Sequence, residues 1–214
     1  MAIITIVGAG MMGSALAFPA RENGNEVRLV GTHLDREIIS ESQKTGKHPK
    51  FDTPFPAGVK YYQIEDVEAA IEGADLIIGG VSSFGVEWFG EKVLHLIPEK
   101  TPILTVTKGL IDTSDGKLIT YLDYWESVAA SLGKNLSLNA VGGPCTSYEL
   151  VAHDHTEVAF CGKDIATLSL IRSYMQTNYY HVSISTDIVG IESAVALKEH
   201  IVSANGIVYD VCRD

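Results

Sequence analysis

Three glycines near the start of the chain have the spacing of a phosphate-binding turn. Gly8, Gly10 and Gly13 follow a short apolar segment rich in β-branched residues and precede a segment with helical periodicity. In a strand–turn–helix unit the first glycine allows a sharp turn, the second leaves room for a pyrophosphate, and the third lets the helix pack closely on the sheet. The free N–H groups at the start of the helix, here from Met11 and Met12, face the phosphates. The pattern therefore predicts a dinucleotide-binding site.

Two lysines lie where an ammonium group has chemical consequences. Lys108 stands beside Gly109 at the end of a predicted strand, Thr101–Thr107, and ligands of parallel sheets bind at such carboxyl ends. Lys198 lies on an apolar stripe of a predicted C-terminal helix, two turns after Ile191. Burial disfavours an ammonium and lowers its pKa, as proton transfer near neutral pH requires. The equally weighted alternatives are a surface position for Lys108 and a head group of Lys198 that reaches water.

Further candidate ligand contacts follow the ends of two other predicted strands. Phe84 comes after the strand Ala74–Val81 and either packs on the nicotinamide or joins the core. After Leu136–Val141, a glycine pair that ends in Gly143 precedes Pro144, and proline is tolerated at the first position of a helix. We therefore expect a helix to begin there and to offer a second set of N–H groups to the site.

The end of the second predicted strand, Glu26–Val30, bears on the choice between NAD and NADP. In NAD-selective folds a carboxylate at this place holds the ribose 2′-hydroxyl. Here the strand is followed by a glycine, Thr32 and His33, which makes NADP admissible and makes these two residues possible donors to its 2′-phosphate. Asp35 is either a substitute ribose ligand or, as we favour, the N-cap of the next helix. The sequence leaves both cofactors open and leans to NADP.

Strands and helices alternate along the chain between these residues. Such alternation implies right-handed βαβ units and a mostly parallel sheet, and therefore a Rossmann-type, doubly wound α/β fold. The stretch 47–56 carries three prolines and is expected to be a solvated surface loop, although its basic residues could border a phosphate site. The remaining predicted strands are residues 59–62, 157–161 and 179–185, and the remaining predicted helices are residues 65–72, 118–132 and 164–175.

Composition and charge exclude several classes of protein. Hydrophobic residues make up 46% of the 214 residues and charged residues 20%, which fits a folded globular chain. A formal net charge of −11 argues against nucleic acid or an anionic membrane surface as partner. No apolar run of the sequence reaches the length of a membrane span, about 18 residues. The three cysteines, Cys145, Cys161 and Cys212, are too few and too scattered for a disulfide framework or a zinc site, so we expect no metal and a reducing, cytoplasmic setting.

Residues 187–214 differ in pattern from the rest of the chain. Asp187 can cap a helix there whose apolar side chains cover nearly every face. Such a helix requires burial all round, which predicts a homodimer or packing against a further domain. We accordingly divide the chain into a dinucleotide-binding domain, residues 1–186, and the first helix of a truncated helical substrate domain, residues 187–214.

In their order and spacing, these motifs resemble those of NAD(P)-dependent glycerol-3-phosphate dehydrogenases across essentially the whole chain. The segments 23–27 and 31–32 look most like archaeal-type members of that family. The segments that carry the resemblance are Gly8-Ala9-Gly10-Met11-Met12-Gly13, Thr107-Lys108-Gly109, Gly143-Pro144-Cys145 with Glu149, Gly190-Ile191-Glu192 and Ala196-Leu197-Lys198.

The resemblance implies a reversible hydride transfer between C2 of sn-glycerol 3-phosphate and C4 of the nicotinamide of NAD or NADP, which gives dihydroxyacetone phosphate. Lys198 would be the general base for the C2 hydroxyl and the acid in the reverse direction. Lys108 would orient the substrate and stabilise charge on its oxygen. Gly143 and Pro144 would contact the substrate.

The chain departs from the family's pattern in three places. Cys145 stands where serine or alanine is common, and Glu199-His200 follows Lys198 where an asparagine is usual. The chain ends at Asp214, inside the first helix of the family's second domain, which would supply further substrate-binding residues. The early end makes one alternative credible, a cofactor-binding module without catalysis. A second alternative is a related Rossmann reductase of a 2-oxo acid or hydroxyacyl substrate, because such folds share the opening motif, although the lysine-glycine and glycine-proline motifs argue against it.

Overall fold

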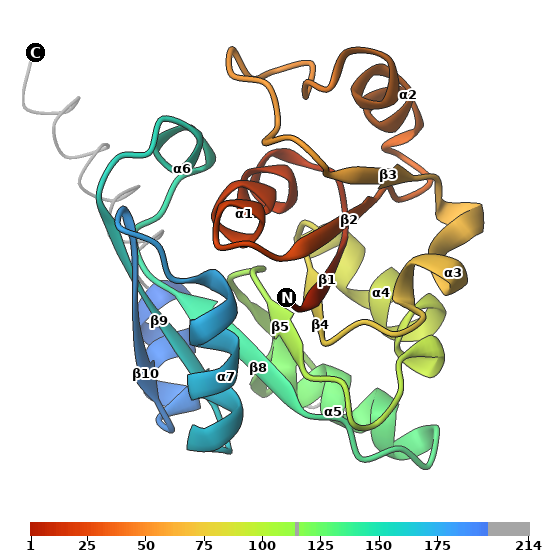
Figure 1. Ribbon diagram of the computed structural model, residues 1–214. Helices are drawn as coiled ribbons and strands as arrows, with labels where there is room; N and C mark the ends of the chain where they lie inside the picture. Colours follow the sequence, from red (N-terminus) through yellow and green to blue (C-terminus); the bar gives the residue numbers. More distant parts are fainter. Residues whose placement is uncertain (114–115, 197–214) are drawn as a thin grey trace, which may run out of the picture.

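The computed structural model describes residues 1–113 and 116–196, and within them one eight-stranded sheet has helices on both faces (Figure 1). Its strands are β1 (Ile3–Val7), β2 (Glu26–Val30), β3 (Lys60–Tyr62), β4 (Leu76–Gly79), β5 (Ile103–Thr105), β8 (Leu138–Gly142), β9 (Thr156–Gly162) and β10 (Tyr180–Ser185). The strand order is β10-β9-β8-β5-β4-β1-β2-β3. All neighbours pair parallel except β8 and β9, which are antiparallel. The expected mostly parallel, doubly wound fold is confirmed.

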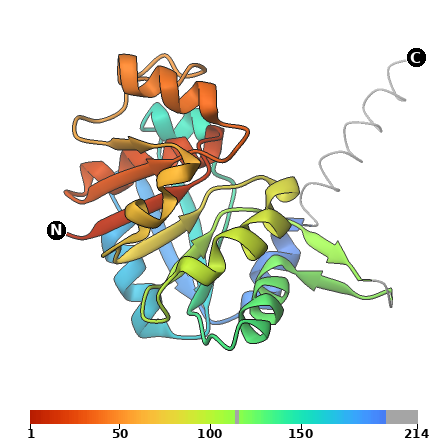
Figure 2. The ribbon, with the colours of Figure 1, turned by 90° about the vertical axis from the view of Figure 1, so that its right-hand side faces the viewer.

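The helices form two layers, one on each face of the sheet (Figures 1 and 2). Because side chains of a strand alternate between faces, Ile4 and Ile6 of β1 pack in one apolar core and Val7 packs in the other. One layer contains α1 (Met11–Glu22) and α7 (Ile165–Met175), and the other contains α3 (Val67–Ile71), α4 (Val86–Lys92) and α5 (Tyr121–Ser131). The remaining helices are α2 (Arg36–Thr45), which contacts β3, and α6 (Ser147–Val151), which contacts α1.

Residues 118–120 are a strand, and the prediction that they begin a helix is wrong. They form β7 (Leu118–Thr120), which pairs antiparallel with β6 (Leu110–Asp112) in a hairpin that projects from the body of the molecule (Figure 2). Helix α5 begins only after Thr120, whose hydroxyl accepts a hydrogen bond from the Asp123 N–H at 3.1 Å. The Asp123 carboxylate accepts one from the Thr120 N–H at 3.0 Å, and this reciprocal capping box fixes the start of the helix.

A second capping box moves the start of α6 away from Pro144. The prediction that a helix begins at this proline is wrong, because α6 begins at Ser147. Thr146 is the N-cap and accepts from the Glu149 N–H at 3.3 Å, while the Glu149 carboxylate accepts from the Thr146 N–H at 3.0 Å. A threonine followed three residues later by a glutamate therefore decides this boundary, and the proline lies in the preceding turn.

The stretch 47–56 covers the outer side of α1, and the prediction of a solvated loop is wrong for its ring-bearing side chains. His48, Phe51 and Phe55 are buried. The rings of Phe51 and Phe55 pack against Phe18 of α1 at centroid distances of 6.3 and 5.7 Å. Aromatic burial thus holds a proline-rich segment on the molecule.

The last described residues, 188–196, are helical and pack on the end of β8. The Gly190 N–H donates to Asp187 Oδ1 at 2.9 Å, as expected of an N-cap. A Cβ at Gly142 would lie 2.5 Å from Cγ2 of Ile191, so the helix approaches the strand closely. The predicted remainder of this helix, residues 197–214 with Lys198, lies outside the described residues. Within residues 1–113 and 116–196, no helix is long and apolar enough to cross a membrane.

Candidate functional site

The glycine-rich turn lies where the strand order reverses, between β1 and β4. Gly8 has a φ of 113°, and a Cβ at this position would lie 2.6 Å from the backbone of Gly80. A Cβ at Gly13 would lie 2.1 Å from the carbonyl oxygen of Gly8. Contacts within the protein therefore require both glycines.

Gly10 is different, because no heavy atom of the described protein lies within 4 Å of the position that its Cβ would take. Gly10 is the N-cap of α1, and no side chain caps that helix. Its first turn also holds no acidic residue. Open space and uncapped N–H groups therefore coincide at a helix N-terminus, which is the arrangement that accepts a pyrophosphate.

A cavity of about 350 Å³, which we call the Lys108 cavity, lies on one side of this turn. Lys108 is half-buried, and its Nζ donates to the Gly143 carbonyl oxygen at 2.7 Å. The structure thus brings together Met11, Met12, Lys108 and Gly143, as predicted for one site. Pro144 does not line this cavity.

Cys145 also lines the Lys108 cavity. Burial raises the pKa of its thiol, and neighbouring Thr156 and Lys108 only partly oppose that effect. The side chain is therefore a neutral thiol near neutral pH, a small and weakly polar wall of the cavity.

A second cavity of about 200 Å³, the Thr32 cavity, lies on the other side of the turn and contains Gly8, Gly10, Thr32 and His33. Phe84 lines it as well and is 96% exposed, so of the two alternatives for this ring, packing in the core is wrong. The Phe84 side chain therefore lines the Thr32 cavity and not the Lys108 cavity. Both cavities share Val81 and Ser82, so they form adjoining parts of one crevice.

The Asp35 carboxylate lies at the Thr32 cavity. Asp35 is the N-cap residue of α2, as we favoured, although its side chain makes no cap hydrogen bond. Oδ2 accepts instead from the Ala9 N–H at 3.1 Å and from the N–H and hydroxyl of Thr32, both at 2.8 Å. The Asp35 N–H donates to the Thr32 carbonyl, and this turn returns the carboxylate to the strand end. A carboxylate therefore stands at the end of β2, so the alternative of Asp35 as a substitute ribose ligand stays open.

The stretch 47–56 also reaches this part of the site. Burial lowers the pKa of His48, an effect to which Lys50 adds and which the Ala9 backbone and Asp35 oppose. The Lys50 N–H donates to Nδ1 of His48 at 3.1 Å. His48 thus lies near Ala9 and Asp35, while no residue of the stretch 47–56 lines the Thr32 cavity itself.

Two further residues of the site were not predicted as site residues from the sequence. Trp88 lines the Thr32 cavity, with its ring centroid 5.8 Å from that of His33. Its position on α4 is that of an ordinary half-buried aromatic. Glu192 is buried beneath the turn that carries Lys108, and only its membership of a family motif marked it.

Comparison with known proteins agrees with this arrangement of turn, lysine and crevice. Residues 3–167 match the sequence family described as NAD-dependent glycerol-3-phosphate dehydrogenase N-terminus. The chain belongs to this family. Its similarity to the NADP(+)-dependent glycerol-3-phosphate dehydrogenase of Archaeoglobus fulgidus is 32% identity over 196 residues, covering 92% of this chain and 57% of that protein.

Other glycerol-3-phosphate dehydrogenases resemble the chain over a similar extent. The NAD(P)+ enzyme of Streptococcus sanguinis is 26% identical over 206 residues, which cover 96% of this chain and 59% of that protein. The crystal structure of glycerol-3-phosphate dehydrogenase from Coxiella burnetii superposes with a TM-score of 0.75 at 28% identity, covering 88% of this chain and 55% of that one. The chain thus spans between a half and three fifths of the length of these relatives.

Proposed function

We propose that this chain is the cofactor-binding part of a glycerol-3-phosphate dehydrogenase. The reaction is a reversible hydride transfer between C2 of sn-glycerol 3-phosphate and C4 of the nicotinamide of NAD or NADP, which gives dihydroxyacetone phosphate. The family match supports this proposal. The observation that carries it is the crevice itself, where a half-buried lysine reaches across the sheet edge beside an uncapped, glycine-rich helix start.

The cofactor would extend along the crevice. Its pyrophosphate would lie over Gly10, held by the N–H groups of Met11 and Met12, because this is the open end of α1. Its adenosine would enter the Thr32 cavity with its nicotinamide in the Lys108 cavity. The bound nicotinamide supplies the hydride acceptor or donor.

The adenosine end holds groups that favour each cofactor. The Asp35 carboxylate suits a ribose 2′-hydroxyl, whereas Thr32 and His33 suit a 2′-phosphate. Phe84 would flank the adenosine with its exposed ring. We therefore propose NAD or NADP without assigning a preference.

Lys108 would act as a fixed cation at the substrate's oxygen. Its ammonium is directed by the hydrogen bond to Gly143, and a positive charge held there stabilises the oxygen as negative charge develops. Gly143 and Pro144 would border the substrate. Lys198 would be the general base for the C2 hydroxyl and the acid in the reverse direction, because it belongs to the family motif Ala196-Leu197-Lys198.

We also propose the division into residues 1–186 and 187–214, a homodimer and a cytoplasmic location. The apolar pattern of residues 187–214 supports a further domain or a dimer partner. The thiols of Cys145 and Cys161 are unpaired, which suits a reducing compartment. We place the reaction in glycerol phosphate metabolism, which links carbohydrate and phospholipid metabolism.

The test is the rate of NADH and NADPH oxidation by this chain on addition of dihydroxyacetone phosphate, with cofactor binding followed in the same samples. Oxidation that depends on this substrate supports the proposal. Cofactor binding without oxidation favours the second candidate, a binding module, because the chain spans only 57% of its Archaeoglobus relative. Oxidation with a 2-oxo acid instead would identify a related reductase.

A further inference from the structure

Glu192 is a buried acid with an unsatisfied oxygen. It lies on the helical segment 188–196 and is only 8% exposed. Its Oε2 has no hydrogen-bond partner among the described residues. Buried carboxyl oxygens are normally hydrogen-bonded, so this one requires an explanation.

A small cavity separates Glu192 from the turn Thr107–Gly109. Its volume is about 10 Å³, and Gly142 and Val195 complete its walls. A cavity of this size holds about one water molecule when polar groups surround it. Here the walls include Glu192 and the turn, so a single water can join the orphan oxygen to the turn.

The turn is held tightly on its other sides. Gly109 has a φ of 142°, and a Cβ there would lie 2.7 Å from the hydroxyl of Tyr121, the first residue of α5. Lys108 donates from Nζ to Gly143. The direction of the Lys108 side chain thus depends on where the backbone of this turn lies, and Glu192 lies beneath that backbone.

We propose that Glu192 is a positioning residue for Lys108, and that its carboxyl group orients the Thr107–Gly109 turn through one water molecule in this cavity. Glu192 does not line the Lys108 cavity. Its effect on turnover therefore rests on the proposed role of Lys108, whereas its effect on the turn does not.

The surroundings of Glu192 make this arrangement sensitive to pH. Burial raises the pKa of Glu192 to about 7, while Thr120 lowers it and Asp123 raises it further. Among residues 1–113 and 116–196, Lys108 and the thiol of Cys161 also lie close to it. The carboxyl group therefore changes from hydrogen-bond donor and acceptor to acceptor alone near neutral pH.

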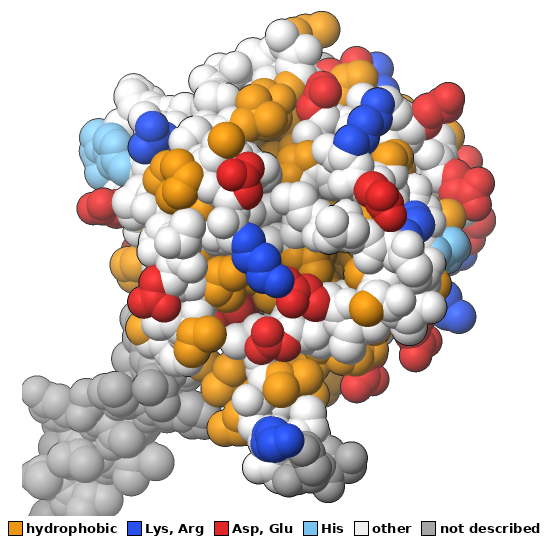
Figure 3. Space-filling view, turned by 90° about the horizontal axis from the view of Figure 1, so that it is seen from below, with side chains coloured by type: hydrophobic (Ala, Val, Ile, Leu, Met, Phe, Trp, Pro, Cys, Tyr) orange, Lys and Arg blue, Asp and Glu red, His pale blue; other side chains and the backbone are white. Residues whose placement is uncertain are grey.

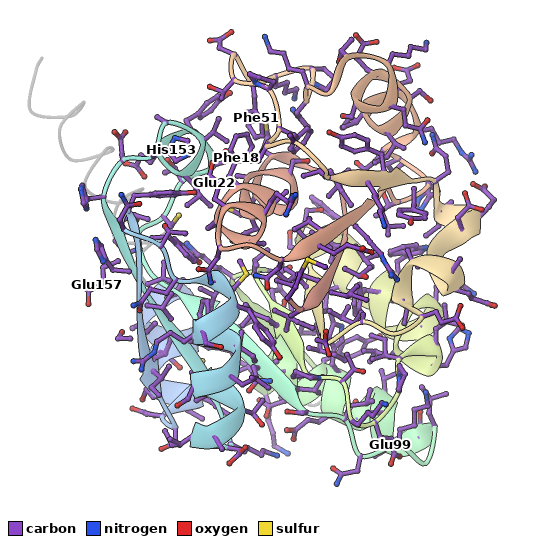
Figure 4. All side chains as sticks on the ribbon, in the orientation of Figure 1. Phe18, Glu22, Phe51, Glu99, His153 and Glu157 are labelled. Carbon is purple, nitrogen blue, oxygen red and sulfur yellow. The ribbon has the colours of Figure 1, made fainter. Side chains whose placement is uncertain are left out.

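The first test needs neither cofactor nor substrate. NMR resonances of the Lys108 and Gly109 amides are followed through neutral pH in the native chain, in Glu192→Gln and in Glu157→Gln. Glu157 is an exposed acid on β9 that points away from the molecule (Figure 4). We expect both amides to titrate with a midpoint near 7 in the native chain and in Glu157→Gln, and to lose this titration in Glu192→Gln.

The second test measures turnover and NADH affinity together. Glutamine retains the hydrogen-bonding capacity, so Glu192→Gln should stay within about 3-fold of the native kcat. Glu192→Leu should lower kcat by about 10- to 100-fold, the cost of a displaced catalytic group, without changing NADH affinity.

Two results would overturn the inference: amide titration that persists in Glu192→Gln, or a folded, NADH-binding Glu192→Leu with native kcat. A native chain without turnover would count against the proposed function alone, and the amide titration would still decide the role of Glu192.

Discussion

Lys108 combines a positive charge with a fixed direction. The hydrogen bond of 2.7 Å from its Nζ to Gly143 joins the loops that follow β5 and β8. An ammonium held in this way has little reorganisation left to undergo when negative charge develops on a substrate oxygen. In the role that we propose for it, Lys108 would act through its fixed position as well as through its charge.

Replacing Lys108 by methionine should abolish turnover and spare cofactor binding. The variant keeps the length and the apolar stem but loses the cation, so we expect kcat to fall by about 100-fold or more, with the NADH dissociation constant unchanged within about 3-fold. Lys92→Met, an exposed lysine at the end of α4, is the matched control. Steady-state kinetics showing native kcat in Lys108→Met would remove this lysine from the mechanism.

Glu192 links the stability of the chain to pH. Because burial raises its pKa to about 7, the folded state keeps a proton that the unfolded state loses at about 4.5. This group therefore destabilises the fold progressively as pH rises from about 4.5 to about 7, and fully above 7.

Glu192→Gln should raise the free energy of unfolding at pH above 7, by on the order of 2–3 kcal/mol. The difference between variant and native chain should shrink as pH falls toward 4.5, the ordinary value for this group. Denaturant unfolding at several pH values measures it. A difference that does not vary with pH would show that Glu192 titrates normally.

Asp35 sets the charge of the Thr32 cavity. Asparagine can still accept the hydrogen bonds from Ala9 and Thr32, but it no longer repels a 2′-phosphate. We expect Asp35→Asn to shift relative affinity toward NADPH over NADH by about 3- to 10-fold. Calorimetric titration with both cofactors checks this, and an unchanged ratio would place the 2′ position away from Asp35.

At the scale of elements, a partly exposed polar cluster joins α1 to the segment that follows α6. The Tyr179 hydroxyl donates to Glu22 Oε2 at 2.6 Å, and Nε2 of His153 lies 2.8 Å from Glu22 Oε1. Figure 4 shows Glu22 and His153 facing each other between the two helices. His153 has a φ of 61°, a left-handed conformation that is uncommon outside glycine. These contacts anchor the region after Gly143 on the helix of the glycine-rich turn.

Tyr179→Phe should lower the free energy of unfolding by about 0.5–1.5 kcal/mol, because a partly buried hydrogen bond to an exposed carboxylate is lost. Tyr148→Phe is the control, since Tyr148 is 63% exposed. Thermal and denaturant unfolding of both variants measure the effect. Equal stability of Tyr179→Phe and the native chain would mean that the cluster does not stabilise the fold.

Across the whole molecule, the predicted bounds of helices and strands were most accurate where a single sequence pattern marked them. Strands β1 and β2 occupy the predicted residues because apolar, β-branched runs end there at glycine or polar residues. Two helices begin later than apolar periodicity and proline predicted. Each begins after a threonine, Thr120 or Thr146, that forms a reciprocal capping box. Local capping chemistry decides such boundaries.

The site was predictable in its backbone and less so in its side chains. The glycines and Lys108 stand at strand ends, and the order of strands brings these ends together. The direction of the Asp35 carboxylate depends on a turn that also needs the Ala9 N–H from another loop. Burial of Phe51 and Phe55 likewise depends on α1, so no local pattern reveals it.

One face of the molecule mixes charges of both signs. On the face shown in Figure 3, Lys and Arg side chains alternate with Asp and Glu among hydrophobic ones, and the coloured residues form no continuous basic patch. A net charge of −11 adds to this. An anionic cofactor must therefore rely on local N–H groups and single cations.

The most direct measurement is calorimetric titration of NADH and NADPH into the native chain and into Gly10→Val. We expect the native chain to bind at least one cofactor. We expect affinity at least about 10-fold weaker in Gly10→Val with little change in thermal stability, because a Cβ there would meet no heavy atom of the described protein within 4 Å and would lie in the path of the pyrophosphate. Absence of binding to the native chain, or equal affinity in the variant, would contradict a dinucleotide in this crevice.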